Sequence, residues 1–224
     1  MRLLKTFTLS MMLPFALACA APAQTAYPDG KTVRIVVPFA AGGAQDVMAR
    51  LIGTKLATRL GTAVIIENKG GAGGVIGADS VAKAAPDGTT LLMATGGAIT
   101  IAPNRPQKLP YDAKADFAPL ALVADTPMTI AVRAQSPLNT LADLIAEAKA
   151  RPGTLTYAST GAGTVSNLTG ELLAQGLGIT LLHVPYRGAS PGISDLIGGQ
   201  VMAMVTSSAS IDPFVASGQV RVLA

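Results

Sequence analysis

The sequence predicts an α/β fold made of two lobes that are joined by crossing hinge strands. Short β-branched segments alternate with segments of helix length, a proline-rich stretch interrupts this pattern, and a second alternating series follows. Strands that alternate with helices of this length form parallel βαβ units, whose sheet is covered on both faces. We therefore expect a first lobe at residues 24–123 and a second lobe at residues 124–224.

The first lobe is expected to hold three strands, each followed by a loop rich in small residues. A β-branched run ends at Pro38, and apolar residues then recur at helical spacing from Val47 to Leu60. A Pro86-Asp87-Gly88 turn precedes the third strand. The expected order is strand 32–37, glycine loop 38–46, helix 47–60, strand 63–66, glycine turn 70–74, helix 78–84 and strand 89–95.

Two apolar runs after the proline-rich stretch, at 120–123 and 128–132, are predicted to be the strands that cross between the lobes. In the second lobe, Asn139 or Thr140 is expected to cap the first helix, which Pro152-Gly153 stops. The expected order there is helix 141–148, strand 155–157, small-residue loop 159–163, helix 165–173 and strands 180–184, 201–206 and 220–224. The last strand runs directly to Ala224, which predicts that the natural domain continues and that its C-terminal part is missing here.

Residues 1–23 are predicted to be a signal peptide, which places the protein in the periplasm. Arg2 and Lys5 precede an apolar stretch, and Ala21-Pro22-Ala23 fits the small-x-small cleavage pattern. The apolar stretch is shorter than the roughly 20 residues that cross a bilayer. Cys19 leaves a lipoprotein as an alternative.

Composition excludes several classes of function. Removal of the signal peptide lowers the net charge from +4 to +2, and no clustered basic stripe with aromatics indicates nucleic-acid binding. The remaining chain holds one histidine and no cysteine, so we expect neither a metal site nor a disulfide. Gly71-Ala72-Gly73 lacks the third glycine of a dinucleotide fingerprint, because Ile76 stands there, and no cofactor is expected.

Two loops, one per lobe, are predicted to bind an anion. Residues 38–46 and 159–166 each lead from a strand into a helix start, where backbone N–H groups are unpaired and the helix dipole is positive. Ligands collect at the carboxyl ends of parallel strands, so the two loops are expected to face one small carboxylate. We expect the amides of residues 40–44 and 160–164 to meet it without covalent chemistry.

The candidate ligand-binding residues come from these loops, from the ends of other strands and from the turn after His183. Tyr186 would supply a wall with a hydroxyl, and Arg187 a fork for carboxylates, although a plain surface turn is an equal alternative. The full set is Phe39, Ala40, Ala41, Gly42, Gly43, Asp46, Thr95, Gly96, Ser159, Thr160, Gly161, Ala162, Gly163, Ser166, Asn167, Tyr186 and Thr206.

The rival enzymatic interpretation is a serine hydrolase that uses Ser159. Tyr157 stands where the nucleophile elbow needs glycine, and Glu171 is the only acidic residue between Ser159 and His183. His183 is therefore expected to be a satisfied structural histidine, and the chain is not expected to be an enzyme. A truncated receptor that binds nothing is the other alternative.

In order and spacing, the motifs resemble the extracytoplasmic solute receptors of tripartite tricarboxylate transporters, the Bug or TctC-like receptors. The resemblance covers nearly everything after the signal peptide. It rests on Val33-Arg34-Ile35-Val36-Val37-Pro38-Phe39, Glu67-Asn68, Ala84-Ala85-Pro86-Asp87-Gly88, Leu109-Pro110-Tyr111-Asp112, Asp116-Phe117-Ala118-Pro119, Tyr157-Ala158-Ser159, His183-Val184-Pro185-Tyr186 and Gly198-Gly199-Gln200.

The resemblance implies a monomeric, periplasmic-binding-protein-like receptor that closes on a carboxylate and delivers it to a membrane permease. Such receptors continue beyond the point where this chain ends, to complete the first lobe. The sequence departs from the family pattern at Met202 and Asn167, where an acidic residue and a histidine are usual. Di- and tricarboxylates, acidic amino acids and aromatic acids all remain open as ligands.

Overall fold

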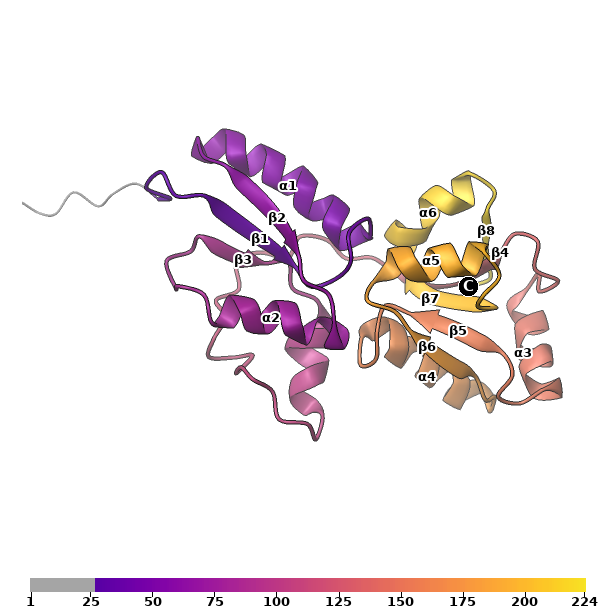
Figure 1. Ribbon diagram of the computed structural model, residues 1–224. Helices are drawn as coiled ribbons and strands as arrows, with labels where there is room; N and C mark the ends of the chain where they lie inside the picture. The colour runs from indigo at the N-terminus through magenta and orange to yellow at the C-terminus, as the bar shows by residue number, and fades with distance from the viewer. Residues whose placement is uncertain (1–26) are drawn as a thin grey trace, which may run out of the picture.

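The computed structural model describes residues 27–224, so the predicted signal peptide lies outside the described residues. Two separate sheets form two lobes that lie side by side (Figure 1). The first lobe, as the term is used below, runs from β1 to η3, and the second lobe from β4 to β8. Residues 105–127 connect them without a helix or strand.

The first lobe is a three-stranded parallel sheet in the order β2-β1-β3. Its strands are β1 (Val33–Val37), β2 (Val64–Asn68) and β3 (Thr90–Leu92). Strand β1 lies in the middle, and all of its residues except Arg34 are buried, as expected for a central parallel strand.

Helices cover both faces of this sheet. Helix α1 (Ala44–Leu60) packs Ala49 against Ile35 and Val37 on one face. Helix α2 (Val75–Ala82) covers the other face, where Ala78 contacts Ala98. Three short helical turns complete the lobe, namely η1 (Ala72–Gly74), η2 (Gly97–Ile101) and η3 (Ala102–Asn104).

The second lobe has a five-stranded sheet in the order β6-β5-β7-β4-β8. Its strands are β4 (Met128–Arg133), β5 (Thr156–Ser159), β6 (Leu182–Pro185), β7 (Ala203–Ser207) and β8 (Val220–Val222). Strand β5 pairs in parallel with β6 and β7, whereas β4 runs antiparallel to β7 and β8. The carboxyl ends of β5 and β7 therefore lie side by side.

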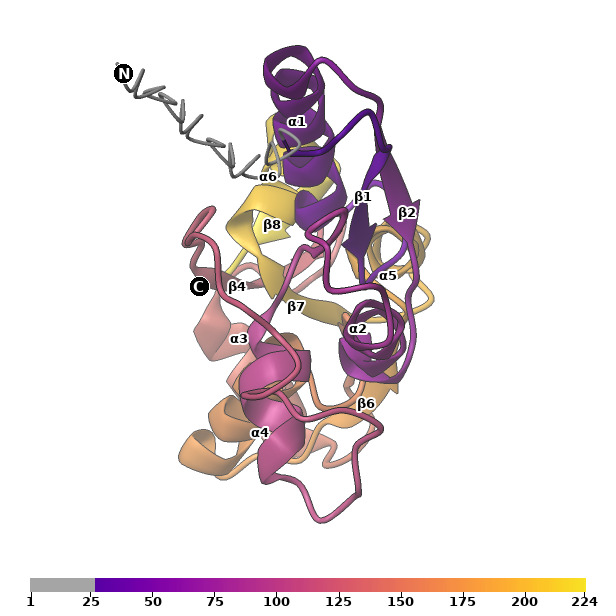
Figure 2. The same ribbon diagram turned by 90° about the vertical axis from the view of Figure 1, so that its left-hand side faces the viewer.

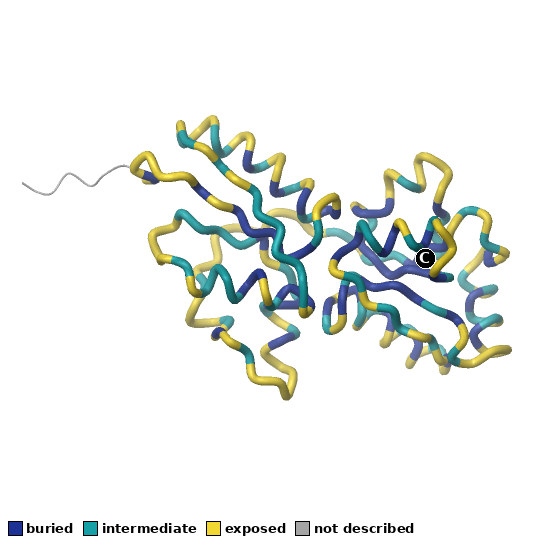
Figure 3. Tube along the Cα trace, in the orientation of Figure 1, coloured by how far each residue is buried: buried dark blue, intermediate teal, exposed yellow. Residues whose placement is uncertain are grey.

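Helices cover both faces of the second sheet, and a buried core lies on each face (Figures 2 and 3). They are α3 (Leu141–Ala150), α4 (Val165–Leu177), α5 (Ala189–Ile197) and α6 (Ser208–Ala216). Leu144 of α3 and Ala174 of α4 share one core, and Ile193 of α5 and Ile211 of α6 share the other. Thr140 caps α3 in a capping box with Asp143.

The prediction of a strand at 120–123 is wrong. This segment is neither helix nor strand, Leu120 and Leu122 are 79 % and 88 % exposed, and no described strand lies beside it to pair with its backbone. An apolar run becomes a strand only when a neighbour accepts its hydrogen bonds. The other predicted crossing run, 128–132, lies in β4 and belongs to the sheet of the second lobe.

Helices α5 and α6 were not predicted. Helix α5 follows Gly188 and contains Pro191 and Gly192, and helix α6 contains Pro213. Proline and glycine usually mark turns, so these residues argued against a helix in both segments. Within residues 27–224 the structure has no helix with both the length and the hydropathy needed for a membrane span.

Candidate functional site

A cavity of about 340 Å³ lies between the two lobes. The first lobe contributes the end of β1 and the glycine turn before α2, and the second lobe contributes the loops after β5 and β6. The lining residues are Phe39, Gly70, Gly71, Ala72, Gly73, Gly74, Ile76, Thr160, Gly161, Ala162, Pro185, Tyr186 and Arg187. The two lobes therefore share one opening at the carboxyl ends of their parallel strands.

Glycines allow the main chains of the lobes to touch at this cavity. A Cβ atom at Gly73, whose φ is +66°, would lie 2.6 Å from the carbonyl oxygen of Ala162. A Cβ at Gly70 would lie 2.9 Å from the carbonyl oxygen of Arg187. Both distances are too short for any side chain, so the lobes meet here backbone against backbone.

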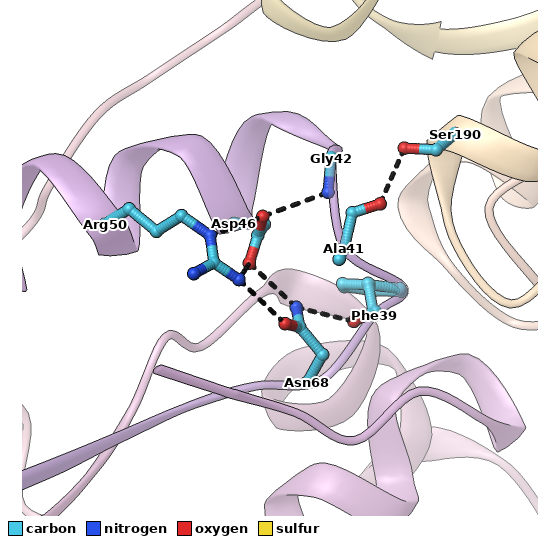
Figure 4. Close-up of polar contacts among 7 residues, drawn as sticks. All are labelled: Phe39, Ala41, Gly42, Asp46, Arg50, Asn68 and Ser190. Carbon is cyan, nitrogen blue, oxygen red and sulfur yellow. Dashed lines mark hydrogen bonds and ion pairs between the residues drawn. The ribbon is translucent and has the colours of Figure 1, made fainter. Parts of the chain in front are cut away.

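Asp46 holds the first loop in shape (Figure 4). Its carboxylate is buried and accepts hydrogen bonds from the Gly42 amide at 3.0 Å, from the Asn68 side chain at 2.9 Å and from two nitrogens of Arg50 at 2.9 and 3.0 Å. Asn68 also donates to the carbonyl oxygen of Phe39 at 3.2 Å. With these hydrogen bonds Asp46 shapes the loop, and its contact with the ligand stays a prediction.

The pKa of the Asp46 carboxyl lies below its usual value. Burial alone would raise it, but the hydrogen bonds from Arg50, Gly42 and Asn68 together outweigh burial. The carboxylate is therefore charged at neutral pH, and it lies in the first turn of α1, where the helix dipole favours negative charge.

Three of the five amides expected from the first loop already have partners. Gly42 N–H donates to Asp46, Ala40 N–H donates to the carbonyl of Arg187 at 2.9 Å, and Ala44 N–H donates to Ser210 Oγ at 3.2 Å. Among the described residues, nothing accepts from the amides of Ala41 and Gly43. That the amides of residues 40–44 meet a carboxylate stays a prediction, and these two are the ones that the described residues leave free to do so.

The second loop is bonded within itself in the same way. Thr160 N–H donates to Ser166 Oγ at 3.1 Å, and Gly163 N–H donates to Asn167 Oδ1 at 2.9 Å. Gly161 N–H donates to Ser159 Oγ, and Thr164 N–H to the carbonyl of Gly161. Of the amides of residues 160–164, that of Ala162 alone has no acceptor among residues 27–224, and Ala162 lies on the cavity wall.

The predicted residues therefore fall into separate groups. Those on the cavity wall are Phe39, Thr160, Gly161, Ala162 and Tyr186. Those that shape the loops through side chains are Asp46, Ser159, Ser166 and Asn167. The others away from the wall are Ala40, Ala41, Gly42, Gly43, Thr95, Gly96, Gly163 and Thr206.

Two residues of the last group carry buried hydroxyls. The Oγ1 atoms of Thr95 and Thr206 have no hydrogen-bond partner among the described residues. Gly96 packs towards the second lobe, because a Cβ there would lie 3.1 Å from Cγ2 of Val165. Tyr186 lines the cavity, but its hydroxyl donates to Asp195 at 2.6 Å; burial and this bond raise its pKa to about 12.

Sequence reasoning missed the glycine turn 70–74 as part of the wall, together with Ile76. The turn itself was predicted, and its position after a parallel strand was the signal that could have assigned it to the site. Arg187, which the sequence left between a ligand contact and a surface turn, lies on the wall beside Tyr186.

Ser159 and His183, 24 residues apart in sequence, lie next to each other. Ser159 Oγ is 2.6 Å from Nε2 of His183, but Ser159 is fully buried and its hydroxyl also contacts the amide of Gly161. Glu171 accepts a hydrogen bond from Tyr157 at 2.5 Å rather than orienting the imidazole. A hydrolase needs an exposed nucleophile and an oriented base, so this pair does not form a hydrolytic site.

Within residues 27–224, no three histidine, cysteine, aspartate or glutamate side chains form a group that could hold a metal ion.

Comparison with known proteins gives the family. Residues 48–224 match the family described as tripartite tricarboxylate transporter family receptor. Over 96 % of this chain, the sequence is 39 % identical to a UPF0065 protein of Bordetella bronchiseptica. Over 92 % of this chain, it is 35 % identical to BugT of Bordetella pertussis. It spans 64 % and 63 % of those two proteins.

Solved structures give the same result. A structure of a periplasmic transporter has a TM-score of 0.85 at 40 % identity, covering 89 % of this chain and 66 % of that one. MatC from Rhodopseudomonas palustris, solved with bound malate, has a TM-score of 0.81 at 36 % identity, covering 86 % and 66 %. An R. palustris protein solved with adipate has a TM-score of 0.82 at 34 % identity, covering 86 % and 64 %.

These matches confirm the α/β, periplasmic-binding-protein-like fold and the resemblance to the Bug receptors. The relatives are solute-binding receptors, so the expectation that the chain is not an enzyme is also confirmed. On the family match and the shared fold together, this chain belongs to the family of tripartite tricarboxylate transporter receptors.

Proposed function

We propose that this protein is a periplasmic receptor that captures a small carboxylate between its two lobes and delivers it to the membrane permease of a tripartite tricarboxylate transporter. The observation that carries the proposal is the cavity of about 340 Å³ walled by both lobes. A ligand in this position contacts both lobes at once, so it favours the closed arrangement over the open one.

The groups near the cavity suit an anion. The amide of Ala162 is unpaired on its wall, and those of Ala41 and Gly43 are unpaired at the start of α1. Arg187 adds a cation on the wall, and a guanidinium can donate two hydrogen bonds to one carboxylate. We propose that the amides bind one carboxylate of the ligand and that Arg187 attracts a second.

Malate and adipate are the first compounds to test, because they are bound in two of the solved relatives. A thermal-shift titration of the whole chain with each acid, and with its neutral diamide as control, measures the dependence on charge. A true ligand at one hundred times its dissociation constant stabilises the folded chain by about 2.7 kcal/mol. An equal shift with the diamide contradicts the carboxylate site, and no shift with any carboxylate supports the alternative of a receptor that binds nothing.

Delivery to a permease needs its own test. Membrane vesicles that carry the partner permease should take up labelled ligand only when this protein is added. Uptake that proceeds at the same rate without it contradicts the role as a receptor. A monomer is expected in solution, and light scattering measures its mass.

A further inference from the structure

Helix α1 begins without a side-chain cap from its own lobe. Its N-cap residue is Gly43, which has no side chain to accept from the first-turn amides. The acceptor for Ala44 N–H is instead the hydroxyl of Ser210 in α6 of the second lobe, at 3.2 Å. Ser210 is buried and also contacts the hydroxyl of Ser207 at 3.1 Å, so its oxygen is held in place.

A second hydroxyl from the same lobe reaches the same loop (Figure 4). Ser190 Oγ in α5 donates to the carbonyl oxygen of Ala41 at 2.8 Å. The contact is close, because a Cβ atom at Gly42, whose φ is +84°, would lie 2.9 Å from Ser190 Oγ. Glycine at this position gives the hydroxyl access to the main chain.

We propose that Ser190 and Ser210 are positioning residues that hold the two lobes together at the start of α1. We call this pair the latch. Neither residue lies on the cavity wall, so neither is expected to touch the ligand. Both bonds join one lobe to the other, and both are lost when the lobes separate. The latch therefore sets the balance between open and closed forms, and through it the affinity for ligand.

The test uses a cross-link that forms only when the lobes are together. A Cβ built on Gly43 lies 3.6 Å from Cβ of Ala189, within the range of about 3.5–4.5 Å that a disulfide needs. Gly43→Cys with Ala189→Cys, made in the whole chain with Cys19→Ser, should therefore oxidise to a disulfide between the lobes. The rate of its formation reports the fraction of molecules that are closed.

We expect Ser190→Ala and Ser210→Ala each to slow cross-linking by about 2- to 10-fold, the usual contribution of one hydrogen bond, and the double variant to slow it further. Ser194→Ala is the matched control in α5, because that hydroxyl donates to the carbonyl of Ser190 within the helix. Ser217→Ala, next to α6, is the second control, because among residues 27–224 the Ser217 hydroxyl bonds only to Phe214 and Gln219. Both controls should cross-link at the parent rate.

Two results would overturn the proposal: no disulfide in the parent pair under oxidising conditions, or equal rates in the parent and in the double alanine variant. Ser190 is only partly buried, so Ser190→Ala keeps the test valid even if Ser210→Ala disturbs folding, which circular dichroism checks. The inference rests on the proposed function only for its effect on affinity. If malate and adipate leave the rate unchanged while the alanine variants slow it, the latch stands and the proposed ligand class fails.

Discussion

The ring of Tyr157 stacks on the ring of His183, with centroids 4.9 Å apart and an angle of 27° between their planes. Together with the contact to Ser159, this stacking encloses the imidazole beside the second loop. Burial lowers the pKa of His183 below its ordinary value of 6.5, and the negative charge of Glu171 opposes this only in part. His183 is therefore neutral at pH 7.

Acid should destabilise the protein through His183. The unfolded chain binds a proton near pH 6.5, whereas the folded chain resists it, so the free energy of unfolding should fall as the pH drops from about 7 towards 5. His183→Gln should flatten this part of the curve, measured by urea unfolding. The imidazole signal of this single histidine should titrate below pH 6.5 in an NMR experiment, and a midpoint at or above 6.5 would contradict the prediction.

Asp46→Asn should destabilise the first lobe by about 1–3 kcal/mol, because it leaves the donors of Arg50, Gly42 and Asn68 without a charged acceptor. Chemical unfolding at pH 7 measures the loss. Because the pKa of Asp46 is lowered in the folded chain, this stabilisation is fully present above pH 3.8, the pKa of the unfolded chain. It is lost as the pH falls through the lower pKa of the folded chain.

The control for Asp46 is Glu147→Gln, which breaks an ion pair with Arg151 on the surface of α3. Exposed pairs of this kind contribute about 0–1 kcal/mol. Equal losses in the two variants would mean that Asp46 is no more than a surface charge.

Gly73→Ala should push the lobes apart. The new methyl group would meet the carbonyl oxygen of Ala162 at 2.6 Å, so the radius of gyration from small-angle scattering should rise and carboxylate binding should weaken. Gly61→Ala is the matched control, because its φ of +63° is almost the same and nothing lies within 4 Å of the new atom. Both changes should cost about 1–2 kcal/mol of backbone strain. Only Gly73→Ala should increase the radius of gyration, so an equal increase in both variants would contradict the contact between Gly73 and Ala162.

Thr206→Val should leave the free energy of unfolding unchanged or raise it by about 1 kcal/mol, because the buried hydroxyl of Thr206 has no partner among the described residues. Its neighbour across the strands, Thr129, donates to the carbonyl of Thr206 at 2.9 Å, so Thr129→Val should cost about 1 kcal/mol. Thermal unfolding of the two variants compares them. A loss at Thr206 as large as that at Thr129 would mean that its hydroxyl is bonded.

Local sequence signals predicted much of the fold. Some signals act within a few residues and can be recognised in the sequence alone. They are the β-branched run of β1, the helical spacing of α1 and the cap at Thr140. Strand direction is not a local property, and the antiparallel β4 was therefore beyond reach. The same holds for 120–123, whose state depends on whether another strand lies beside it.

The candidate site was predicted only in outline. The two loops were found from their glycines, but which amides remain free depends on acceptors elsewhere in the fold. Arg187 and Ser210, which occupy the amides of Ala40 and Ala44, are more than 140 positions away in the chain. The carboxylate of Asp46 likewise depends on Asn68, which only the pairing of β1 with β2 brings close.

The backbone contact at Gly73 has a consequence for engineering. At Gly70 and Gly73 the two lobes meet through main-chain atoms, whereas Ile76, Tyr186 and Arg187 line the cavity between them. Exchanging those three side chains should change which ligand is preferred and leave the backbone contacts at Gly70 and Gly73 in place. Under the proposed function, the side chains that select the ligand are separate from the backbone contacts that join the lobes, so the fold is a suitable starting point for designed small-molecule sensors.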